Sequence, residues 1–575
     1  TATNENSLYD SYIRAFRWAS DRIGNKGVLC FVTNGAWLDS NTADGFRHEL
    51  EKEFSAVYVF NLRGNQRTSG ELSRREGGKI FGSGSRTPVA ITLLIKKPGH
   101  TGKAQIFYHD IGDYLTREEK LHKVETFADY AALPWEQLHP NEYNDWINQR
   151  CGDFNDFVPL NDGDVAIFCM RSGGLKTNRD AWCYNFSNEL LQQKIKGMID
   201  FYNQQVSLYG EQCRKSGKNA ESIVDKLIDT NPYKIKWNRS LRNDLCKVKR
   251  ADFILSHVYK GIYRPYTKQM VYFDRQFNDM VYRQPSLFPT ANHNNLVIQV
   301  TGIGINKDFS CLVVDRLPDV QTFANGQCFP LYYYEKNEPK GKAVEQGSLI
   351  PQKSKPKQLG LPMPKPVTEE YTRKDAITDA ALEHFQTHYE DDTIGKEDLF
   401  YYVYGILHSP VYRERYAADL KKMLPRVPLA PDFWGFSKAG RELAHWHLDY
   451  EQVEPWPVEE ERKPQGDMDD FTYYHVEKMR FPKKGERGTI IYNGNITFKG
   501  IPLDAYDYVV NGKSALDWIM ERYAITIDKD SGIRNDPNDW CREHNDPTYI
   551  YNLVKRIIRV SLETNRIVAG LPGID

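Results

Sequence analysis

A glycine-rich basic segment from Asn61 to Lys97 contains the side chains best suited to chemistry in this sequence. Between Arg63 and Lys97 it has eight basic and two acidic residues, whereas the whole chain has a net charge of −1. Guanidinium groups, and backbone amides left accessible at glycines, bind phosphate well. One aromatic residue, Phe81, lies in the middle. This combination is typical of a loop that holds nucleic acid while one base is handled, and a solvated surface loop is the equally open alternative.

Three groups of polar and basic residues are candidates for contact with DNA. Each basic side chain is as compatible with solvation as with a phosphate contact. The glycine-flanked second group could also reach base edges, and the third flanks aromatic residues. The groups are Arg67, Arg74, Arg75, Lys79 and Arg86; then Lys176, Thr177, Asn178 and Arg179; then Arg264 and Lys268.

Several short motifs resemble catalytic sites without meeting their requirements. Asn511-Gly512-Lys513-Ser514 resembles the end of a phosphate-binding P-loop, but Asp507 stands where that motif needs glycine. Glu118-Glu119-Lys120 has the spacing of some nucleases, and we interpret it as a solvated charge run. His445 and His447 form an H-x-H pair without a cysteine or carboxylate array, so we predict no metal site.

The composition is that of a soluble protein with several domains. The 575 residues include 40% hydrophobic, 27% charged and 13% aromatic residues, and no apolar run reaches the roughly 20 residues that span a bilayer. Nine scattered cysteines without a C-x-x-C pair favour buried, reduced thiols. We therefore expect a cytoplasmic protein without membrane contact. The polar start at Thr1, which lacks an initiator methionine, predicts a fragment of a longer chain.

The elements that position the basic segment alternate between helix and strand. Helical spacing of apolar residues predicts helices over 9–23 and 46–54, and apolar runs predict strands over 28–33, 57–60 and 88–95. We expect the first strand to be parallel and covered on both faces. The fold class is therefore α/β: the second half of a doubly wound, Rossmann-like sheet, occupying residues 1–110.

The rest of the chain is more irregular. We predict a connector over 111–160 and a mixed α+β domain over 161–575, with helices over 189–202 and 396–423, the second bending at Pro410. Further strands are expected over 490–501 and 506–510. Subdivisions are predicted near 335–367 and 455–485, the first as an exposed linker.

The order of these elements resembles the later motifs of gamma-class adenine-N6 DNA methyltransferases. The resemblance rests on Ser7-Leu8-Tyr9, Gly27 to Leu38, Val57 to Phe60, Ile80-Phe81 and Val89 to Ile91. A closer similarity, covering essentially the whole chain, is to the C-terminal half of Type ISP restriction–modification enzymes. It rests on Asn61 to Arg67, Lys176 to Trp182, Tyr263 to Tyr266 and Leu407 to Tyr412.

The resemblance implies a target-recognition domain joined to part of an adenine methyltransferase that uses S-adenosylmethionine. Phe81 matches the aromatic residue that packs against the flipped adenine, with a loop-anchoring core residue as the alternative. Tyr12 matches a position at the edge of the cofactor, where core packing is equally open. The catalytic Asn-Pro-Pro-aromatic motif and the cofactor glycine motif are absent from the sequence, so we assign no catalytic residue to this chain.

The similarity also implies partners outside the chain. Nuclease, translocase and methyltransferase segments would precede it, and ATP and Mg²⁺ would act through them. The interpretation is a monomeric piece of an enzyme that recognises a duplex DNA site for adenine-N6 methylation, translocation and cleavage. One alternative is a stand-alone DNA-specificity module without activity. A weaker one is an aromatic-rich protein that binds RNA or glycans.

Overall fold

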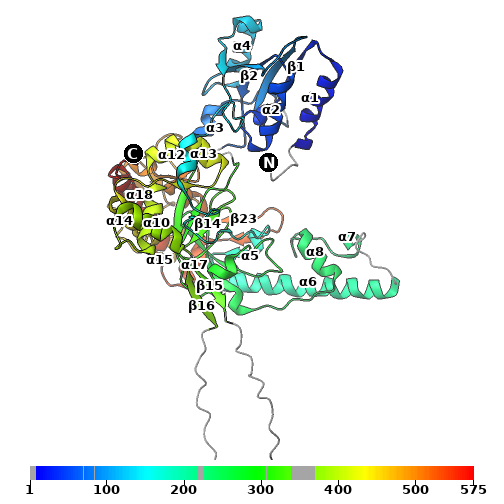
Figure 1. Ribbon diagram of the computed structural model, residues 1–575. Helices are drawn as coiled ribbons and strands as arrows, with labels where there is room; N and C mark the ends of the chain where they lie inside the picture. Colours follow the sequence, from blue (N-terminus) through cyan, green and yellow to red (C-terminus); the bar gives the residue numbers. More distant parts are fainter. Residues whose placement is uncertain (1–7, 69, 83, 217–223, 306, 338–369) are drawn as a thin grey trace, which may run out of the picture.

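The computed structural model describes residues 8–68, 70–82, 84–216, 224–305, 307–337 and 370–575. An N-terminal unit built on one five-stranded sheet sits on a larger C-terminal unit of small sheets and helices (Figure 1). The architecture is mixed α/β, as predicted. The predicted linker at 335–367 falls largely outside the described residues, from 338 onward.

The N-terminal sheet has the strand order β1-β3-β2-β4-β5. The central strand β2 is buried along most of its length, as its run of β-branched and aromatic residues requires. Helix α1 packs Phe16 against Phe31 of β1, at a ring-centroid distance of 4.6 Å. The elements are α1 (Ser11–Arg22), β1 (Gly27–Asn34), α2 (Asp44–Glu53), β2 (Ala56–Arg63), α3 (Gly70–Glu76), β3 (Val89–Lys96), β4 (Gln105–Asp110), α4 (Arg117–Phe127) and β5 (Glu136–Leu138).

Strand β3 lies antiparallel between β1 and β2, which corrects the expected all-parallel pairing of β1. Strands β2 and β4 are parallel. Among the described residues β3 is the one strand paired with β1. On one face of β1, Val28 is 60% exposed and Val32 is 54% exposed. Half of β1 thus meets solvent, so the expectation of a strand covered on both faces was wrong.

Part of the segment predicted as a connector belongs structurally to the N-terminal unit. Strand β5 pairs antiparallel with β4 and extends the sheet. Beyond it, Trp146 is buried, and its ring lies 5.4 Å from that of Trp37. Residues up to about 150 therefore share the core of this sheet.

The C-terminal unit contains two four-stranded sheets, ordered β13-β9-β10-β8 and β12-β11-β14-β7, together with shorter ladders. Apart from the parallel pair β13–β9, these strands pair antiparallel. Their bounds are β6 (Val158–Pro159), β7 (Ser172–Gly173), β8 (Tyr184–Asn185), β9 (Val258–Arg264), β10 (Thr267–Tyr272), β11 (Val297–Val300), β12 (Cys311–Val314), β13 (Leu317–Pro318), β14 (Gln327–Pro330), β15 (Tyr332–Lys336), β16 (Tyr371–Asp375), β17 (Arg426–Val427), β18 (Glu459–Arg462), β19 (Ile490–Ile491), β20 (Ile496–Lys499), β21 (Val509–Val510), β22 (Lys513–Ser514), β23 (Thr526–Ile527) and β24 (Arg534–Asn535).

Helices cover these sheets, and α6 projects from them as an arm (Figure 1). The predicted helix over 396–423 forms three helices, and Pro410 starts the second, where proline is favoured. The helices are α5 (Asp180–Cys183), α6 (Asn188–Ser216), α7 (Val224–Leu227), α8 (Arg239–Cys246), α9 (Gln284–Leu287), α10 (Asp379–Tyr389), α11 (Lys396–Ile406), α12 (Pro410–Arg415), α13 (Ala417–Lys422), α14 (Phe433–Leu448), α15 (Asp470–Tyr473), α16 (Ala515–Arg522), α17 (Pro537–Glu543) and α18 (Tyr549–Ala569).

All nine cysteines are free thiols, but their burial differs from the expectation. Cys30 and Cys169 are exposed, whereas Cys183, Cys311 and Cys328 are buried. Within the described part of the chain, no helix is long and apolar enough to cross a membrane.

Helices α11 and α14 cross with their backbones in near contact. A Cβ atom at Gly440 would lie 1.9 Å from the carbonyl oxygen of Tyr401, and one at Gly405 would lie 2.4 Å from that of Phe436. No flexible side chain can yield there, since the clash is with backbone. The crossing depends on these two glycines.

We expect Gly440→Ala to lower the free energy of unfolding by about 1–3 kcal/mol, because overpacking forces the helices apart. Gly197→Ala in α6 is the matched control, since a Cβ there meets nothing within 4 Å. The control should leave stability unchanged or raise it by up to about 1 kcal/mol, because alanine favours helix. Urea unfolding of both variants measures this. Equal effects would show that the crossing tolerates a methyl group.

Candidate nucleic-acid interface

The basic segment is held firmly by helix α4 beneath it. The ammonium group of Lys120 is buried and donates hydrogen bonds to the carbonyl oxygens of Glu76 and Gly78, at 2.7 and 2.9 Å. Burial lowers the pKa of Lys120 to about 8. Arg117 donates to the carbonyl oxygen of Ile80 at 2.8 Å. Lys120 was interpreted from the sequence as part of a solvated charge run, and the structure corrects this.

Glycines of the segment allow its backbone to touch the start of α4. The amide of Gly78 donates to the carbonyl oxygen of Leu115 at 2.8 Å. At Gly77, where φ is +67°, a Cβ atom would lie 2.2 Å from that oxygen. The segment is thus a scaffolded surface, which keeps its exposed side chains in place.

A cavity of about 690 Å³ opens where β1, β2 and β4 end. These strands run in the same direction, so their carboxyl ends meet at one edge of the sheet, where α/β proteins bind ligands. Asn34, Asn61 and Asp110 line it from the strands, and Lys421 and Lys422 line it from the C-terminal unit. The cavity is therefore shared between the two units.

The side chains of the five candidate basic residues of the segment differ in their contacts and exposure. Arg67 and Arg75 line the cavity. Arg75 pairs with Asp113 at 3.1 Å, and Arg74 forms an ion pair with Glu71. Arg86 is exposed and donates to the carbonyl oxygen of Gln66 at 3.1 Å. Lys79 is half-buried. Contact of these residues with phosphate stays a prediction.

Phe81 and Tyr12, the two aromatic residues singled out from the sequence, lie in different settings. Phe81 is 49% exposed on the anchored segment, next to the buried Ile80, so its ring is available to a partner. Tyr12 is half-buried against the core of the sheet, and burial together with Asp10 raises its pKa to about 12. Neither residue lines the cavity at the strand ends.

The second candidate group surrounds another cavity, of about 410 Å³. Lys176 and Asn178 face Asp279, at 3.2 and 2.7 Å. Thr177 and Arg179 are buried: the Thr177 hydroxyl donates to Asp180, and Arg179 donates to the carbonyl oxygen of Phe277 at 2.7 Å. The first two side chains are open to a ligand, whereas the latter two position the loop.

Both residues of the third candidate group form ion pairs within the protein. Arg264 pairs with Asp319 at 2.9 Å and Asp180 at 3.4 Å. Burial raises the pKa of Asp319 to about 7, and the charge of Arg264 opposes that rise. Lys268 pairs with Glu451 at 2.6 Å and is largely buried. DNA contact by Arg264 or Lys268 stays a prediction that this geometry does not favour.

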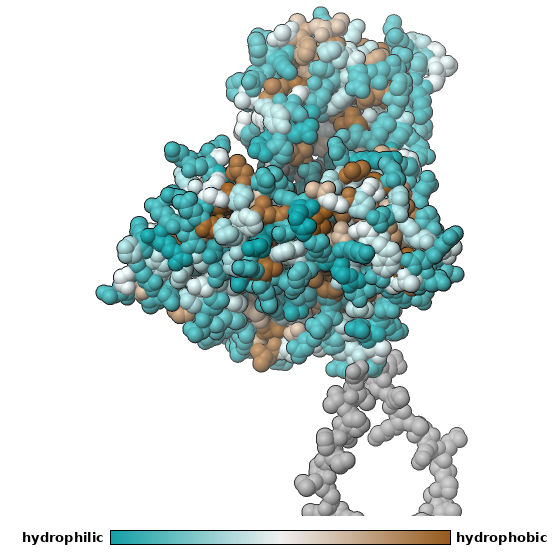
Figure 2. Space-filling view, turned by 90° about the vertical axis from the view of Figure 1, so that its left-hand side faces the viewer, coloured by the Kyte–Doolittle hydropathy of each residue, from teal (hydrophilic) through white to brown (hydrophobic). Residues whose placement is uncertain are grey.

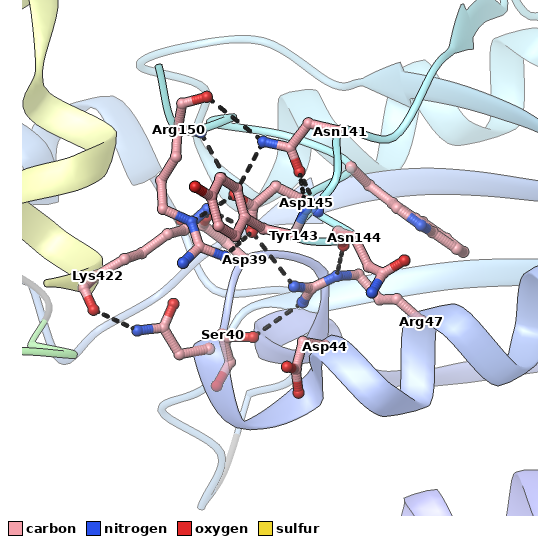
Figure 3. Close-up of polar contacts among 12 residues, drawn as sticks. Asp39, Ser40, Asp44, Arg47, Asn141, Tyr143, Asn144, Asp145, Arg150 and Lys422 are labelled. Atoms are coloured by element: carbon pink, nitrogen blue, oxygen red, sulfur yellow. Dashed lines mark hydrogen bonds and ion pairs between the residues drawn. The ribbon is translucent and has the colours of Figure 1, made fainter. Parts of the chain in front are cut away.

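A buried ion cluster joins the two units (Figure 3). Lys422 of α13 lies 3.2 Å from both Asp39 and Asp145 of the N-terminal unit, and Lys421 lies 2.6 Å from Asp39. On the other side of Asp145, Arg47 is 3.6 Å away and Arg150 is 2.8 Å away. Nothing in the sequence pointed to this cluster, because its members are far apart along the chain.

Most charges of the cluster are compensated, although Arg47 Nη2 and Asp39 Oδ1 are buried without a hydrogen bond. Burial opposes ionisation of Asp145, but the hydrogen bond from Arg150 and the charge of Lys422 hold its pKa below the ordinary value. Arg47 also donates to the carbonyl oxygens of Trp37 and Asn144, each at 2.7 Å. The hydrogen bonds fix the position of each charge, and with it the seating of one unit on the other.

The face seen in Figure 2 is mostly hydrophilic, with the N-terminal unit seated on the broader C-terminal unit. Among the described residues, no group of three or more His, Cys, Asp or Glu side chains is placed to hold a metal ion. The arrangement offers polar cavities, exposed cations and one accessible aromatic ring. Such a surface suits nucleic acid.

Comparison with known proteins identifies similar sequences and folds. The family described as the Type ISP C-terminal specificity domain matches residues 166–553. A comparison with curated proteins found no match.

Three solved structures resemble the chain over its full length. A nuclease-deletion mutant of the Type ISP restriction–modification enzyme LlaGI, in complex with a DNA substrate mimic, is 38% identical with a TM-score of 0.84. The ATP-dependent Type ISP enzyme LlaBIII bound to DNA is 36% identical with a TM-score of 0.84, and a DrdV–DNA complex is 31% identical with a TM-score of 0.80. The chain covers 49%, 34% and 53% of those chains, respectively.

We expect Lys422→Met to destabilise the contact between the units by up to about 3–5 kcal/mol, because it removes the buried cation that lies between Asp39 and Asp145. The neighbouring Lys421→Met is the matched control. Its side chain is 36% exposed, against 2% for Lys422, so its loss should cost about 0–1 kcal/mol. Denaturant unfolding and limited proteolysis between the units measure the difference. Equal costs would show that the cluster does not fix the seating.

Proposed function

The chain belongs to the Type ISP restriction–modification family and contains its C-terminal specificity domain, and on this premise we propose that it recognises a specific duplex DNA site for adenine-N6 methylation. The observation that carries the proposal is the full-length likeness to enzymes solved with DNA. The chain spans about half or less of those proteins. Translocation and cleavage are therefore proposed for the larger enzyme, together with the use of ATP and Mg²⁺.

We propose that the target adenine leaves the helix and stacks on Phe81. A base taken out of a duplex loses its neighbours and needs a replacement face, which an accessible aromatic ring provides. Phe81 is half exposed, and its backbone is anchored through Ile80 and Lys120. A ring held in this way meets a base without first becoming ordered, which favours binding.

S-adenosylmethionine is the methyl donor implied by the resemblance, and we propose that this chain alone does not bind it. Tyr12, the candidate at the cofactor edge, is packed against the core and does not line the cavity at the strand ends. On this proposal the chain contributes at most one edge of the cofactor site. We assign its binding, and the catalytic residues, to segments outside this chain.

The exposed strand β1 supports the proposal that other segments complete the methyltransferase. Its outer edge has no partner among the described residues, and Val28 and Val32 are exposed beside it. Sheet edges of this kind are normally paired or covered in a complete protein. We propose that the remaining methyltransferase strands continue the sheet there.

A stand-alone specificity module is the second candidate function, favoured by the absence of an Asn-Pro-Pro-aromatic motif from the sequence. Both candidates require recognition of duplex DNA, and they differ in methyl transfer. We further propose that the protein acts in the cytoplasm as a monomer. Size-exclusion chromatography with light scattering tests the monomeric state.

Phe81→Ala, made in the enzyme that includes the upstream segments, should weaken methylation of duplex DNA by the equivalent of about 1–3 kcal/mol, because the base loses its stacking face. DNA binding should fall less, since the basic side chains remain. Radiolabelled methyl transfer and fluorescence anisotropy measure the two effects.

Phe81→Trp is the control, because it keeps an aromatic face and should retain methylation. An equal loss of binding and methylation in Phe81→Ala would remove the stacking role. Lack of methyl transfer by the unmodified enzyme would favour the stand-alone module instead.

A further inference from the structure

We propose that a basic arm formed by residues 234–250 binds the phosphate backbone of duplex DNA next to the recognised site. This inference rests on the proposed function and extends the DNA contact beyond the loop around Lys176. The segment has seven basic residues and one acidic residue. In a chain with net charge −1, this is a strong local excess of positive charge.

The arm is a rigid structure. Helix α8 packs Leu241 and Leu245 into the apolar cluster that also contains Tyr202 of α6. The side chain of Asn203 donates to the carbonyl oxygen of Ala251 at 2.7 Å and accepts from its amide at 3.0 Å. These contacts fix the middle and the C-terminal end of the basic segment, so its charges there are held at set positions.

Exposed cations stand on the arm outside any ion pair. Lys236, Arg239 and Lys247 are exposed and form no ion pair or hydrogen bond through their side chains with the described residues. A carboxylate does lie near Lys236, whose charge helps to lower the pKa of Asp528. By contrast, Lys234 pairs with Asp229 at 3.0 Å and Lys249 with Asp244 at 3.3 Å. The first three ammonium and guanidinium groups are thus free to meet a polyanion.

The charge of Arg239 does not serve the stability of the arm, whereas Lys247, the C-cap of α8, stands where the helix dipole favours a cation. Arg239 begins α8, where the helix dipole disfavours a positive charge. Lys247 precedes Val248, whose φ of +54° is rare for a β-branched residue. Unfavourable local features of this kind are commonly retained where a surface has a function.

The arm is continuous with the candidate loop at Lys176. Asp279 accepts hydrogen bonds from Asn178 at 2.7 Å and from Asn238, the N-cap of α8, at 3.0 Å. Lys236 and Lys176 line the same cavity of about 410 Å³. Figure 1 shows α8 along the projecting α6, on the side that faces the N-terminal unit. One backbone could therefore follow both surfaces.

Duplex DNA is the partner that this pattern fits. Its phosphates are regularly spaced, and each neutralised phosphate releases counter-ions. Lysine and arginine side chains on a projecting arm make phosphate contacts that position a protein without reading sequence. The arm should therefore add affinity that depends on salt and not on base sequence.

The test compares binding of the full chain and its Lys236→Gln/Arg239→Gln/Lys247→Gln variant to a mixed-sequence duplex of about 40 base pairs across a range of salt concentrations. Loss of three phosphate contacts should reduce the slope of log affinity against log salt by about 3. Circular dichroism checks that the arm stays folded.

The matched control is Lys478→Gln/Lys483→Gln/Lys484→Gln, which removes the same charge from exposed lysines elsewhere in the C-terminal unit. It should leave the slope unchanged. An unchanged slope in the arm variant, or an equal reduction in the control, would overturn the inference while the proposed function stands. Failure of the unmodified chain to bind duplex DNA would overturn both.

Discussion

The buried ion cluster of Arg47, Asp145 and Lys422 is the constraint on which the arrangement of the two units depends. Ions removed from water are stable in one geometry, in which each finds its counter-charge and its hydrogen bonds. Ion pairs and hydrogen bonds are directional, so a displacement of one unit relative to the other would break those of the cluster. A fixed distance between a recognition surface and a cavity at the strand ends lowers the entropy cost of engaging one ligand with both. The cluster provides that fixed distance.

The same principle operates within each candidate surface. Lys120 is buried and supports the basic segment through its backbone carbonyls, and Arg264 holds Asp180 and Asp319 behind the second cavity. In both places a charged side chain forms contacts inside the protein, and these contacts hold neighbouring exposed side chains in a defined position. Many of the polar residues conspicuous in the sequence therefore position the surface and do not form it. Residues such as Arg67 and Phe81 are left exposed on it.

The helices and strands of the N-terminal unit were largely predictable from the sequence, but the pairing of the strands in the sheet was not. Apolar periodicity identified α1, α2 and the strands β1, β2 and β3, because burial imposes that pattern directly. The insertion of β3 between β1 and β2 depends on contacts distant in sequence, which periodicity does not contain. The burial of Lys120 was missed for the same reason. The excess of basic residues over 234–250 is visible in the sequence. It was missed because the basic residues are spread over a helix and the turns on either side of it.

Strand β1 has a practical consequence for handling the chain by itself. An unpaired edge beside exposed Val28 and Val32 is a template onto which a strand from a second molecule can add. Such edge-to-edge growth is an early route to aggregation, and it becomes faster at high protein concentration. Cys30 is exposed on the same face, so oxidation could lock neighbouring copies together through a disulfide. Reducing conditions and low concentration would keep preparations of this chain dispersed.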